Sequence, residues 1–294
     1  RQGCGKKPFG RMSENQNVEP AARQAGPVAQ SHSVFRCGGG VCRPDVCEFI
    51  GEEPLVIRVD GKPYSVVMRT PGEELAHAAG FCLGEGIADS PDDFLTIGYC
   101  KDLDPNVVEI RLKPERREKI RDLLERKSFV SQTSCGICGK ELVKDIYQVV
   151  APSADPFRVS IDQVLKCIDR LAENQVIHRR TRGAHAALLI DRRLEVVSFA
   201  EDVGRHNALD KAIGKAFVAR KLSDAVVLIL SSRISYEMVQ KAARARLPIV
   251  IGMSRPTALA AEMGRSLNMT LACAARQSEL IVVSGEDRLV SDGA

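Results

Sequence analysis

The sequence contains no tryptophan, and aromatic residues make up only 4% of its 294 positions. Proteins that bind single-stranded nucleic acids stack the bases on aromatic side chains, so this scarcity argues against such a platform. Lys and Arg exceed Asp and Glu by only 42 to 38, whereas duplex-binding proteins concentrate more positive charge. We therefore expect no nucleic-acid partner, and the mildly basic balance suits a small anionic ligand or an acidic partner.

Long apolar runs are also missing. None approaches the ~20 residues that a membrane span requires, and residues 1–30 lack the apolar core of a secretory signal peptide. Ten cysteines spread over a chain of this size do not resemble a small disulfide scaffold, and we interpret them as reduced thiols, some of them buried and inert. These features predict a cytoplasmic protein with no membrane partner.

The first 45 residues predict a disordered leader. Residues 1–45 are rich in Gly, Gln, Asn, Ser and Pro and show no periodicity. Cys37, Cys42 and Cys47 lie at its end, at every fifth position. A metal or cluster site is conceivable there, but the spacing matches none of the common ligand patterns. We interpret these three cysteines as incidental or redox-labile thiols.

Residues 46–150 predict a small α+β domain. Apolar runs on either side of Asp60-Gly61 predict a hairpin on an Asp-Gly turn. Thr70-Pro71 then predicts a helix, with Thr70 as its N-cap and Pro71 in its first turn. Strands near residues 96–99 and 107–112 follow, and residues 115–127 predict one strongly charged, solvated helix.

Residues 151–294 predict the larger domain. A capping box at Ser160 and Gln163 begins its first helix, and buried strands then alternate with amphipathic helices to the end of the chain. Continuous Val, Ile and Leu strands between such helices are typical of helices layered on both faces of a largely parallel sheet. The predicted fold class is therefore α/β, with a C-terminal three-layer α/β/α domain and a smaller N-terminal α+β domain.

Polar clusters stand at the strand ends of this second domain. Three of them, residues 201–207, 231–235 and 254–257, follow strands and precede helices. Ligands of such sheets bind beyond the carboxyl ends of the strands. Each cluster joins a helix N-terminus to an arginine (Arg205, Arg233, Arg255), a combination suited to phosphate or pyrophosphate. Together they predict a site for an anionic, nucleotide-like ligand.

The histidines divide into two groups. His185 ends a fourth polar cluster, residues 181–185, which precedes a strand and lies at the same edge of the sheet or at the opposite one. His206 lies in the first cluster, and we interpret both as ligand-site residues. His77 and His178 lie on helical segments and are interpreted as structural.

Two cysteines stand in a glycine frame, Ser134-Cys135-Gly136-Ile137-Cys138-Gly139. A thiolate on such a small-residue loop can be approached by a partner protein. A second thiol three positions on can resolve a covalent sulfur intermediate, share a metal or close a disulfide. The spacing alone does not choose among these chemistries.

Other parts of the sequence argue against three rival readings of this pair. A zinc deaminase needs His-x-Glu upstream of its cysteines, whereas here the cysteines come before His185, which Ala186-Ala187 follows. A thioredoxin-like motif opens a helix after the first strand of a small domain, whereas this pair lies mid-chain. A structural zinc site requires a second pair of ligands, which only the cysteines of the leader could supply.

These motifs resemble one family, the formate dehydrogenase accessory sulfurtransferases (FdhD/NarQ). The resemblance runs from about residue 50 to the C-terminus, and its longest segment is residues 201–211, Glu-Asp-Val-Gly-Arg-His-Asn-Ala-Leu-Asp-Lys. The other matching segments are residues 70–71, 80–87, 134–140, 183–187, 233–238, 256–257 and 270–271.

The resemblance implies a cytoplasmic homodimer that accepts sulfur from a cysteine desulfurase as a persulfide. It implies transfer of that sulfur to the molybdenum (or tungsten) bis(molybdopterin guanine dinucleotide) cofactor, before the cofactor enters formate dehydrogenase. It also implies a cytidine-deaminase-like C-terminal domain without deaminase activity. Cys135 matches the persulfide-carrying catalytic cysteine and Cys138 its partner. The arginines of the three clusters would then bind the pyrophosphates of the cofactor.

One segment departs from the family pattern. After the last long strand the family carries a Phe and an Arg-Gly in a cofactor-contacting segment, and here only Arg276 matches clearly. The cofactor-binding residues implied for this segment are Ala274, Ala275, Arg276, Gln277, Ser278 and Glu279.

Two other functions stay open. A cofactor-binding chaperone without sulfur chemistry predicts tight nucleotide binding and no persulfide. A protein that uses the cysteine pair for structural zinc predicts stoichiometric zinc and loss of folding on chelation.

Overall fold

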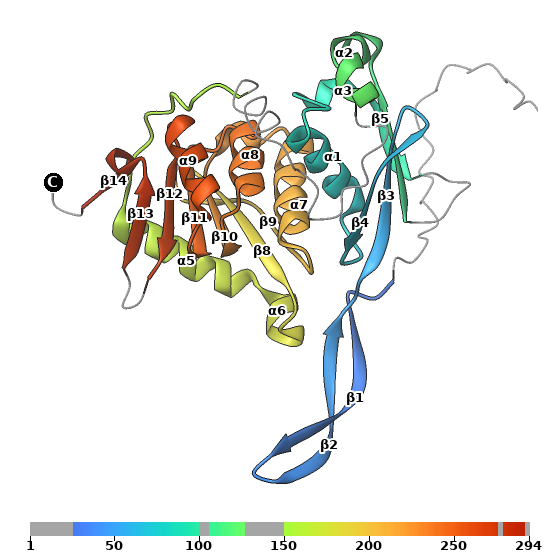
Figure 1. Cartoon of the computed structure of the whole chain (residues 1–294), viewed down its shortest axis with the longest axis vertical. Helices are drawn as coiled ribbons and strands as arrows, with labels where there is room; N and C mark the ends of the chain where they lie inside the picture. Colours follow the sequence, from blue (N-terminus) through green and yellow to red (C-terminus); the bar gives the residue numbers. More distant parts are fainter. Residues whose placement is uncertain (1–25, 100–105, 127–149, 276–278, 292–294) are drawn as a thin grey trace, which may run out of the picture.

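The computed structural model describes residues 26–99, 106–126, 150–275 and 279–291 of the chain. These residues form a projecting two-stranded hairpin, a four-stranded sheet, a six-stranded sheet and a short two-stranded pair (Figure 1). Helices pack on and between the two larger sheets. Within the described residues, no helix is long and apolar enough to cross a membrane.

The hairpin consists of β1 (Ala29–Gly38) and β2 (Val41–Ile50), which pair antiparallel along their whole length. The predicted disordered leader over residues 1–45 is therefore wrong for residues 29–45. Gly39 and Gly40 have φ of 59° and 79°, the conformation that a two-residue hairpin turn requires of both its residues. The glycine run that we interpreted as a sign of disorder is the turn that closes the hairpin.

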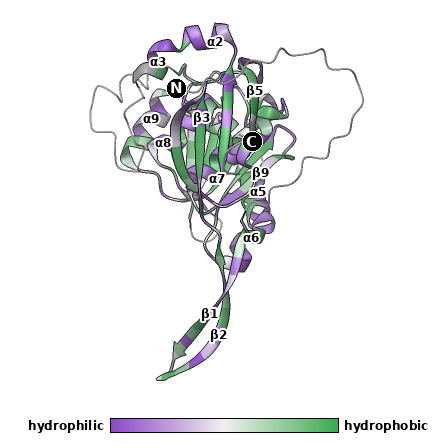
Figure 2. Ribbon diagram, turned by 90° about the vertical axis from the view of Figure 1, so that its right-hand side faces the viewer, coloured by the Kyte–Doolittle hydropathy of each residue, from purple (hydrophilic) through white to green (hydrophobic). Residues whose placement is uncertain are grey.

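A disulfide links Cys37 and Cys42 at the tip of the hairpin, where the two residues face each other with Cα atoms 4.1 Å apart. The prediction of reduced thiols is wrong for this pair. Cys47 is free, and Cys82, Cys167 and Cys273 are free and buried, as the interpretation of inert thiols predicts. Figure 2 shows the hairpin extending from the body as a ribbon of mixed hydropathy.

The four-stranded sheet has the spatial order β4 (Lys62–Arg69), β3 (Glu53–Val59), β6 (Val107–Leu112) and β5 (Phe94–Tyr99). The predicted hairpin on Asp60-Gly61 is confirmed as β3 and β4, with φ of 49° and 81° at the turn.

Short helices accompany this sheet. The 3₁₀ helix η1 (Pro91–Asp93) precedes β5. The predicted charged helix is two short helices, α2 (Pro114–Lys119) and α3 (Arg121–Arg126), because the buried Ile120 between them leaves helical geometry.

The first long helix begins later than its sequence predicts. α1 (Glu74–Gly84) follows Gly72 and Glu73, both with positive φ, and has no side-chain N-cap. The predicted N-cap at Thr70 is wrong, because the Thr70 hydroxyl accepts a hydrogen bond from the backbone N–H of Val203 instead. A contact with a distant strand end thus replaces the local cap.

The six-stranded sheet has the spatial order β13 (Leu280–Ser284), β12 (Thr270–Ala274), β11 (Ile249–Ser254), β10 (Ala225–Arg233), β8 (His185–Asp191) and β9 (Val196–Asp202). β10, β11 and β12 are mutually parallel, whereas β8 and β13 run antiparallel to their neighbours. The predicted largely parallel core is confirmed at β10, β11 and β12, and the reversed strands β8 and β13 make the sheet as a whole mixed. The tight β8–β9 and β12–β13 connections leave no room for crossover helices, so these pairs are antiparallel.

Helices cover both faces of this sheet. α7 (Arg205–Val218), α8 (Tyr236–Arg244) and α9 (Ala258–Ser266) pack on the face that carries Leu189 and Leu228. α5 (Ile161–Asn174) packs on the other face, against Leu188 and Ile229. Alternate residues of one strand thus serve two cores, as the period of a strand requires. The Ser160–Gln163 capping box of α5 is confirmed.

Shorter elements complete the described fold. α6 (Val176–Thr181) follows α5, and the 3₁₀ turns η2 (Leu222–Asp224) and η4 (Glu286–Arg288) precede β10 and the final strand. That final strand, β14 (Leu289–Val290), pairs in parallel with β7 (Val159–Ser160).

α1 and α7 join the two larger sheets. Gly80 of α1 lies so close to α7 that an added Cβ would overlap the backbone carbonyl of Asp210, and one at Gly214 would overlap that of Ala76. The helices therefore pack backbone against backbone. One hydrophobic core consequently runs from Leu55 of the four-stranded sheet to Leu271 of the six-stranded sheet. The two predicted domains share this core.

Candidate functional site

Strand direction brings the predicted site residues to one edge of the six-stranded sheet. β9, β10, β11 and β12 all end at this edge, and β8 begins there. We call the edge the rim; its residues are His185, Arg205, His206, Arg233, Arg255, Ala274 and Ala275. His185 pairs in register with Asp202 at the end of β9, so the fourth polar cluster lies at the same edge as the other three.

A histidine and a carboxylate face each other across the rim. His206, in the first turn of α7, places its Nε2 2.5 Å from Oε2 of Glu237, in the first turn of α8. Both side chains are partly buried, at 26% and 37% exposed. The close contact with His206 lowers the pKa of Glu237, although burial opposes the shift. Glu237 was not among the predicted site residues.

Positive charge accumulates beside this pair. Burial and the neighbouring Arg233 lower the pKa of the Arg205 guanidinium from its ordinary value. Burial also lowers the pKa of His185, and Arg205 adds to the shift. Each of these groups would gain from a nearby negative charge, because an opposite charge favours the charged form.

Two buried donors at the rim have no hydrogen-bond partner among the described residues. They are Nε of Arg205 and the hydroxyl of Ser235, the residue that precedes α8. An unpaired buried donor costs free energy unless a ligand or water satisfies it. The rim therefore offers an anion both positive charge and unpaired hydrogen-bond donors at the N-termini of α7 and α8.

The rim continues toward β12. Arg233 pairs in register with Ser254, and the exposed Arg255 follows directly. Burial raises the pKa of the Cys273 thiol, against the effect of Arg255. Beyond β12, the backbone N–H of Ala275 donates to the carbonyl of Glu279 at 2.8 Å.

Several predicted site residues are not placed by the structure. Arg276, Gln277 and Ser278 lie outside the described residues, as do Cys135 and Cys138. Within the parts of the chain that the structure describes, no three His, Cys, Asp or Glu side chains group as metal ligands do.

A buried polar network lies behind the rim. Asp202 accepts hydrogen bonds from the backbone N–H of Thr70 at 3.0 Å and from Nδ2 of Asn207 at 2.9 Å. Lys211 places Nζ 2.7 Å from Oδ2 of Asp202 and donates to the carbonyl of Thr70 at 2.7 Å. Sequence reasoning placed none of these residues in a buried network, although all four belong to segments that carry the family resemblance. A contact between Thr70 and Asp202, 132 positions apart, has no local signal.

His77 and His178 are the two histidines that we interpreted as structural. His77 is fully buried, and burial together with Lys211, Lys241 and Arg69 holds its pKa well below the ordinary value. His178 bonds through Nδ1 to the carbonyl of Ala184 at 3.0 Å.

Comparison with known proteins agrees with these motifs. A model of the FdhD/NarQ family matches residues 50–290. A curated relative from Streptomyces coelicolor, named sulfur carrier protein FdhD, is 37% identical over 276 residues, which cover 90% of this chain and 96% of the relative. A relative of the same name from Mycobacterium tuberculosis is 36% identical over 250 residues, covering 81% of this chain and 90% of the relative.

A solved structure shares the fold. It is described as a candidate formate dehydrogenase accessory protein from Desulfotalea psychrophila. It superposes with a TM-score of 0.72 at 20% identity, covering 90% of this chain and all of that one.

Proposed function

Because the chain belongs to the FdhD/NarQ family, we propose that it is a sulfur carrier that serves formate dehydrogenase. The names of its relatives support the sulfur-carrying role. The observation in this chain that supports it best is the rim, where Arg205 and Arg233 stand together and Arg205 keeps a buried donor unpaired. An edge of that kind suits a cofactor that carries pyrophosphate groups.

The proposed chemistry begins at Cys135. Its thiolate attacks the terminal sulfur of a persulfide on a cysteine desulfurase. A new S–S bond forms to Cys135, the S–S bond of the donor breaks, and the donor leaves as a thiolate. The protein thus acts as a sulfurtransferase with a cysteine persulfide intermediate.

Cys138 completes the proposed cycle. Its thiolate attacks the inner sulfur of the Cys135 persulfide, which forms a Cys135–Cys138 disulfide and releases hydrosulfide. The released sulfur is taken up by the acceptor, and a dithiol reductant restores the two thiols for the next round. Each step exchanges one S–S bond for another or for a thiolate, so electrons balance once the reductant is included.

The proposed acceptor is the molybdenum or tungsten bis(molybdopterin guanine dinucleotide) cofactor, as a substrate. Arg205, Arg233 and Arg255 would bind its pyrophosphates, and His185 and His206 would contact the same ligand. As the family resemblance implies, residues 274–279, which follow the end of β12, would also contact it. The helix N-termini at the rim add partial positive charge to this site.

Three further properties belong to this proposal. We propose that the protein acts in the cytoplasm as a homodimer. We also propose that residues 151–294 are related in fold to cytidine deaminases, with residues 46–150 as a smaller partner domain.

Mass spectrometry tests the sulfur-carrying step. The protein is incubated with a cysteine desulfurase and cysteine, and its peptides are analysed with and without reductant. We expect one added sulfur atom on the Cys135 peptide, removed by reduction. The Cys135→Ala variant should gain none, whereas Cys47→Ser, which removes a free thiol on the hairpin, should gain sulfur like the wild type.

Absence of the added sulfur, with an active desulfurase, would refute the carrier. A cofactor-binding chaperone would then be the better account, provided that the rim still binds nucleotide.

Calorimetric titration with GDP tests the rim. We expect Arg205→Gln and Arg233→Gln each to weaken binding by roughly 10- to 100-fold, because each removes a charge-assisted hydrogen bond. Arg121→Gln is the matched control, since Arg121 is an exposed arginine of α3. Equal affinity in all four proteins would remove the rim from the ligand site.

A further inference from the structure

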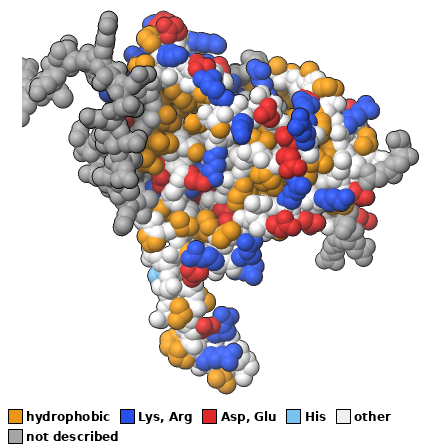
Figure 3. Space-filling view, turned by 180° about the vertical axis from the view of Figure 1, so that it is seen from behind, with side chains coloured by type: hydrophobic (Ala, Val, Ile, Leu, Met, Phe, Trp, Pro, Cys, Tyr) orange, Lys and Arg blue, Asp and Glu red, His pale blue; other side chains and the backbone are white. Residues whose placement is uncertain are grey.

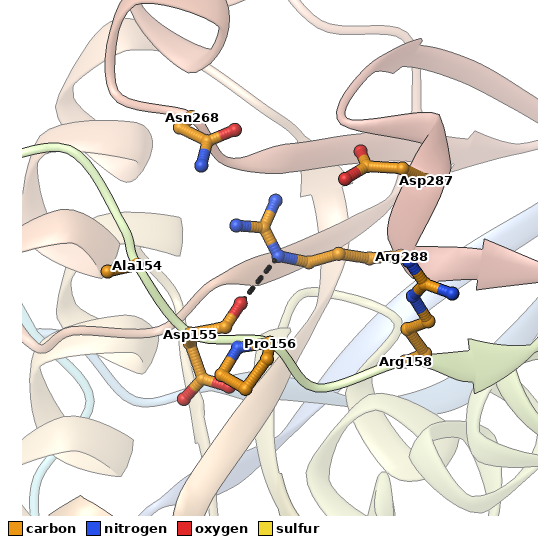
Figure 4. Close-up of a pocket in the computed structure, with 7 residues that line it drawn as sticks. All are labelled: Ala154, Asp155, Pro156, Arg158, Asn268, Asp287 and Arg288. Atoms are coloured by element: carbon orange, nitrogen blue, oxygen red, sulfur yellow. Dashed lines mark hydrogen bonds between the residues drawn. The ribbon is translucent and has the colours of Figure 1, made fainter.

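A polar cavity lies at the edge of the six-stranded sheet opposite the rim (Figure 4). It has a volume of about 210 Å³. Three connections line it: the segment 154–158 that leads into β7, the turn after α9 that contains Asn268, and the η4 turn with Asp287 and Arg288. The turn with Asn268 precedes β12 and η4 follows β13, so both lie at the edge where β12 begins, whereas the rim lies where β12 ends. No residue that lines the cavity belongs to the rim.

Arg288 is the buried charge of this cavity. Its side chain is 4% exposed, and its Nε donates to the backbone carbonyl of Asp155 at 3.1 Å. Its Nη1 is buried and finds no hydrogen-bond acceptor within the described ranges. Figure 4 shows the guanidinium pointing between Ala154 and Asn268, into the cavity. A buried guanidinium nitrogen without an acceptor is costly, so its orientation favours a ligand that supplies one.

No carboxylate of the described residues forms an ion pair with Arg288, although the charge of Arg288 contributes to the lowered pKa of Asp155. Asp155 turns its carboxylate to the exposed Arg192, with contacts of 3.1 Å and 2.5 Å. The Arg192 hydrogen bond lowers the pKa of Asp155, although burial opposes it. Asp287 is exposed and forms no ion pair in the described structure, so water screens its charge.

A second arginine lines the same cavity. Arg158 lines the cavity and is exposed, and Figure 4 shows its guanidinium below Asp287, on the side of the cavity away from Ala154. Two guanidinium groups can together bind the oxygens of one doubly charged phosphate group. A carboxylate has a single charge and two oxygens, which one bidentate arginine satisfies. The amide of Asn268 lies above the Arg288 guanidinium as a further polar group.

We propose that this cavity binds the phosphate group of a small molecule, with Arg288 as the buried anchor and Arg158 as the second cation. The volume exceeds that of a phosphate group alone and leaves room for a few attached carbon atoms, as in a small phosphomonoester. The site lies apart from the rim, so it is independent of the proposed sulfur transfer.

Titration calorimetry with inorganic phosphate and with glycerol 3-phosphate tests this site in the full chain. We expect saturable binding of both, tighter for the ester. Arg158→Gln should weaken it by at least ~10-fold, through loss of a charge-assisted contact. Asp287→Asn should tighten it by about 2- to 3-fold, because it removes a screened like charge. Both substitutions are at exposed positions and leave the core intact.

Rim variants separate this site from the first. Arg233→Gln should leave phosphate binding at the cavity unchanged, while it weakens GDP binding at the rim. The proposal is overturned if no saturable binding occurs at phosphate concentrations up to tens of millimolar. It is also overturned if Arg233→Gln abolishes the binding, or if Arg158→Gln and Asp287→Asn both bind like the wild type.

Discussion

Asp202 and Lys211 form a buried ion pair, with Oδ2 and Nζ 2.7 Å apart and side chains 0% and 2% exposed. Both also bond to the backbone of Thr70, Asp202 to its N–H and Lys211 to its carbonyl. The pair therefore ties the segment between β4 and α1 to the start of α7. It links the four-stranded sheet to the rim, because Thr70 lies 132 positions before Asp202 and 141 before Lys211.

Lys211→Met should destabilise the protein strongly. The substitution leaves Asp202 buried without its cation, and breaking a buried pair in this way costs about 3–5 kcal/mol. Urea unfolding at neutral pH measures the loss. Arg220→Gln is the control, because Arg220 and Asp92 form a pair that is 62% and 61% exposed, and its free energy of unfolding should stay at the wild-type value. A wild-type stability for Lys211→Met would contradict the assignment of this pair.

Gly80→Ala and Gly214→Ala should each separate α1 from α7. The added Cβ would overlap a backbone carbonyl of the facing helix at either position, and overpacking of this kind costs typically 1–3 kcal/mol. Gly98→Ala in β5 is the matched control, since nothing lies within 4 Å of its added Cβ. Thermal unfolding of the three variants tests the prediction, which fails if Gly80→Ala is as stable as Gly98→Ala.

His77 should make the protein sensitive to mild acid. The pKa of the buried imidazole lies well below 6.5 in the folded protein, so the unfolded chain takes up its proton first as the pH falls. Stability is therefore retained above pH 6.5 and decreases below it, by at most about 1.4 kcal/mol per pH unit from this group.

The free energy of unfolding, measured between pH 5 and pH 8, tests this sign. His77→Gln should show a shallower decline below pH 6.5. Ala79→Gly, at a buried position of the same helix, should lower stability at every pH without changing the slope. An unchanged slope in His77→Gln would show that other groups cause the acid sensitivity.

The hairpin disulfide should be dispensable for the stability of the body. β1 and β2 project away from the sheets, and Figure 3 shows the hairpin exposing hydrophobic and charged side chains together. The hairpin contacts the body at α6, where Arg180 forms an ion pair with Glu48. We expect Cys37→Ser to unfold at the wild-type temperature but to be cut faster by protease within residues 29–50.

Peptide mapping without reductant checks the connectivity. Cys37 and Cys42 should appear in one linked species, while Cys47 is alkylated as a free thiol. A link that includes Cys47 would contradict the observed register, in which Cys47 faces His32.

Local patterns predicted many elements closely. The strand predicted at residues 107–112 is β6 (Val107–Leu112), and the capping box of α5 formed as its spacing predicts. The errors came where distant contacts override local preference. Thr70 stands before a proline as an N-cap residue would, but its hydroxyl accepts a hydrogen bond from the backbone N–H of Val203 and its own N–H donates to Asp202.

The sequence by itself determined the Asp60-Gly61 hairpin, the start of α5, the alternation of strands and helices after it, and the segments that carry the family motifs. Hydrophobic period, turn glycines and capping residues act over a few positions, so these features have local signals. Only the tertiary structure decided the direction of β8 and β13, the shared edge of His185 and Arg205, and the burial of Asp202 with Lys211. These depend on pairing between segments far apart in the chain, where the free energy of desolvation and packing selects one partner from many.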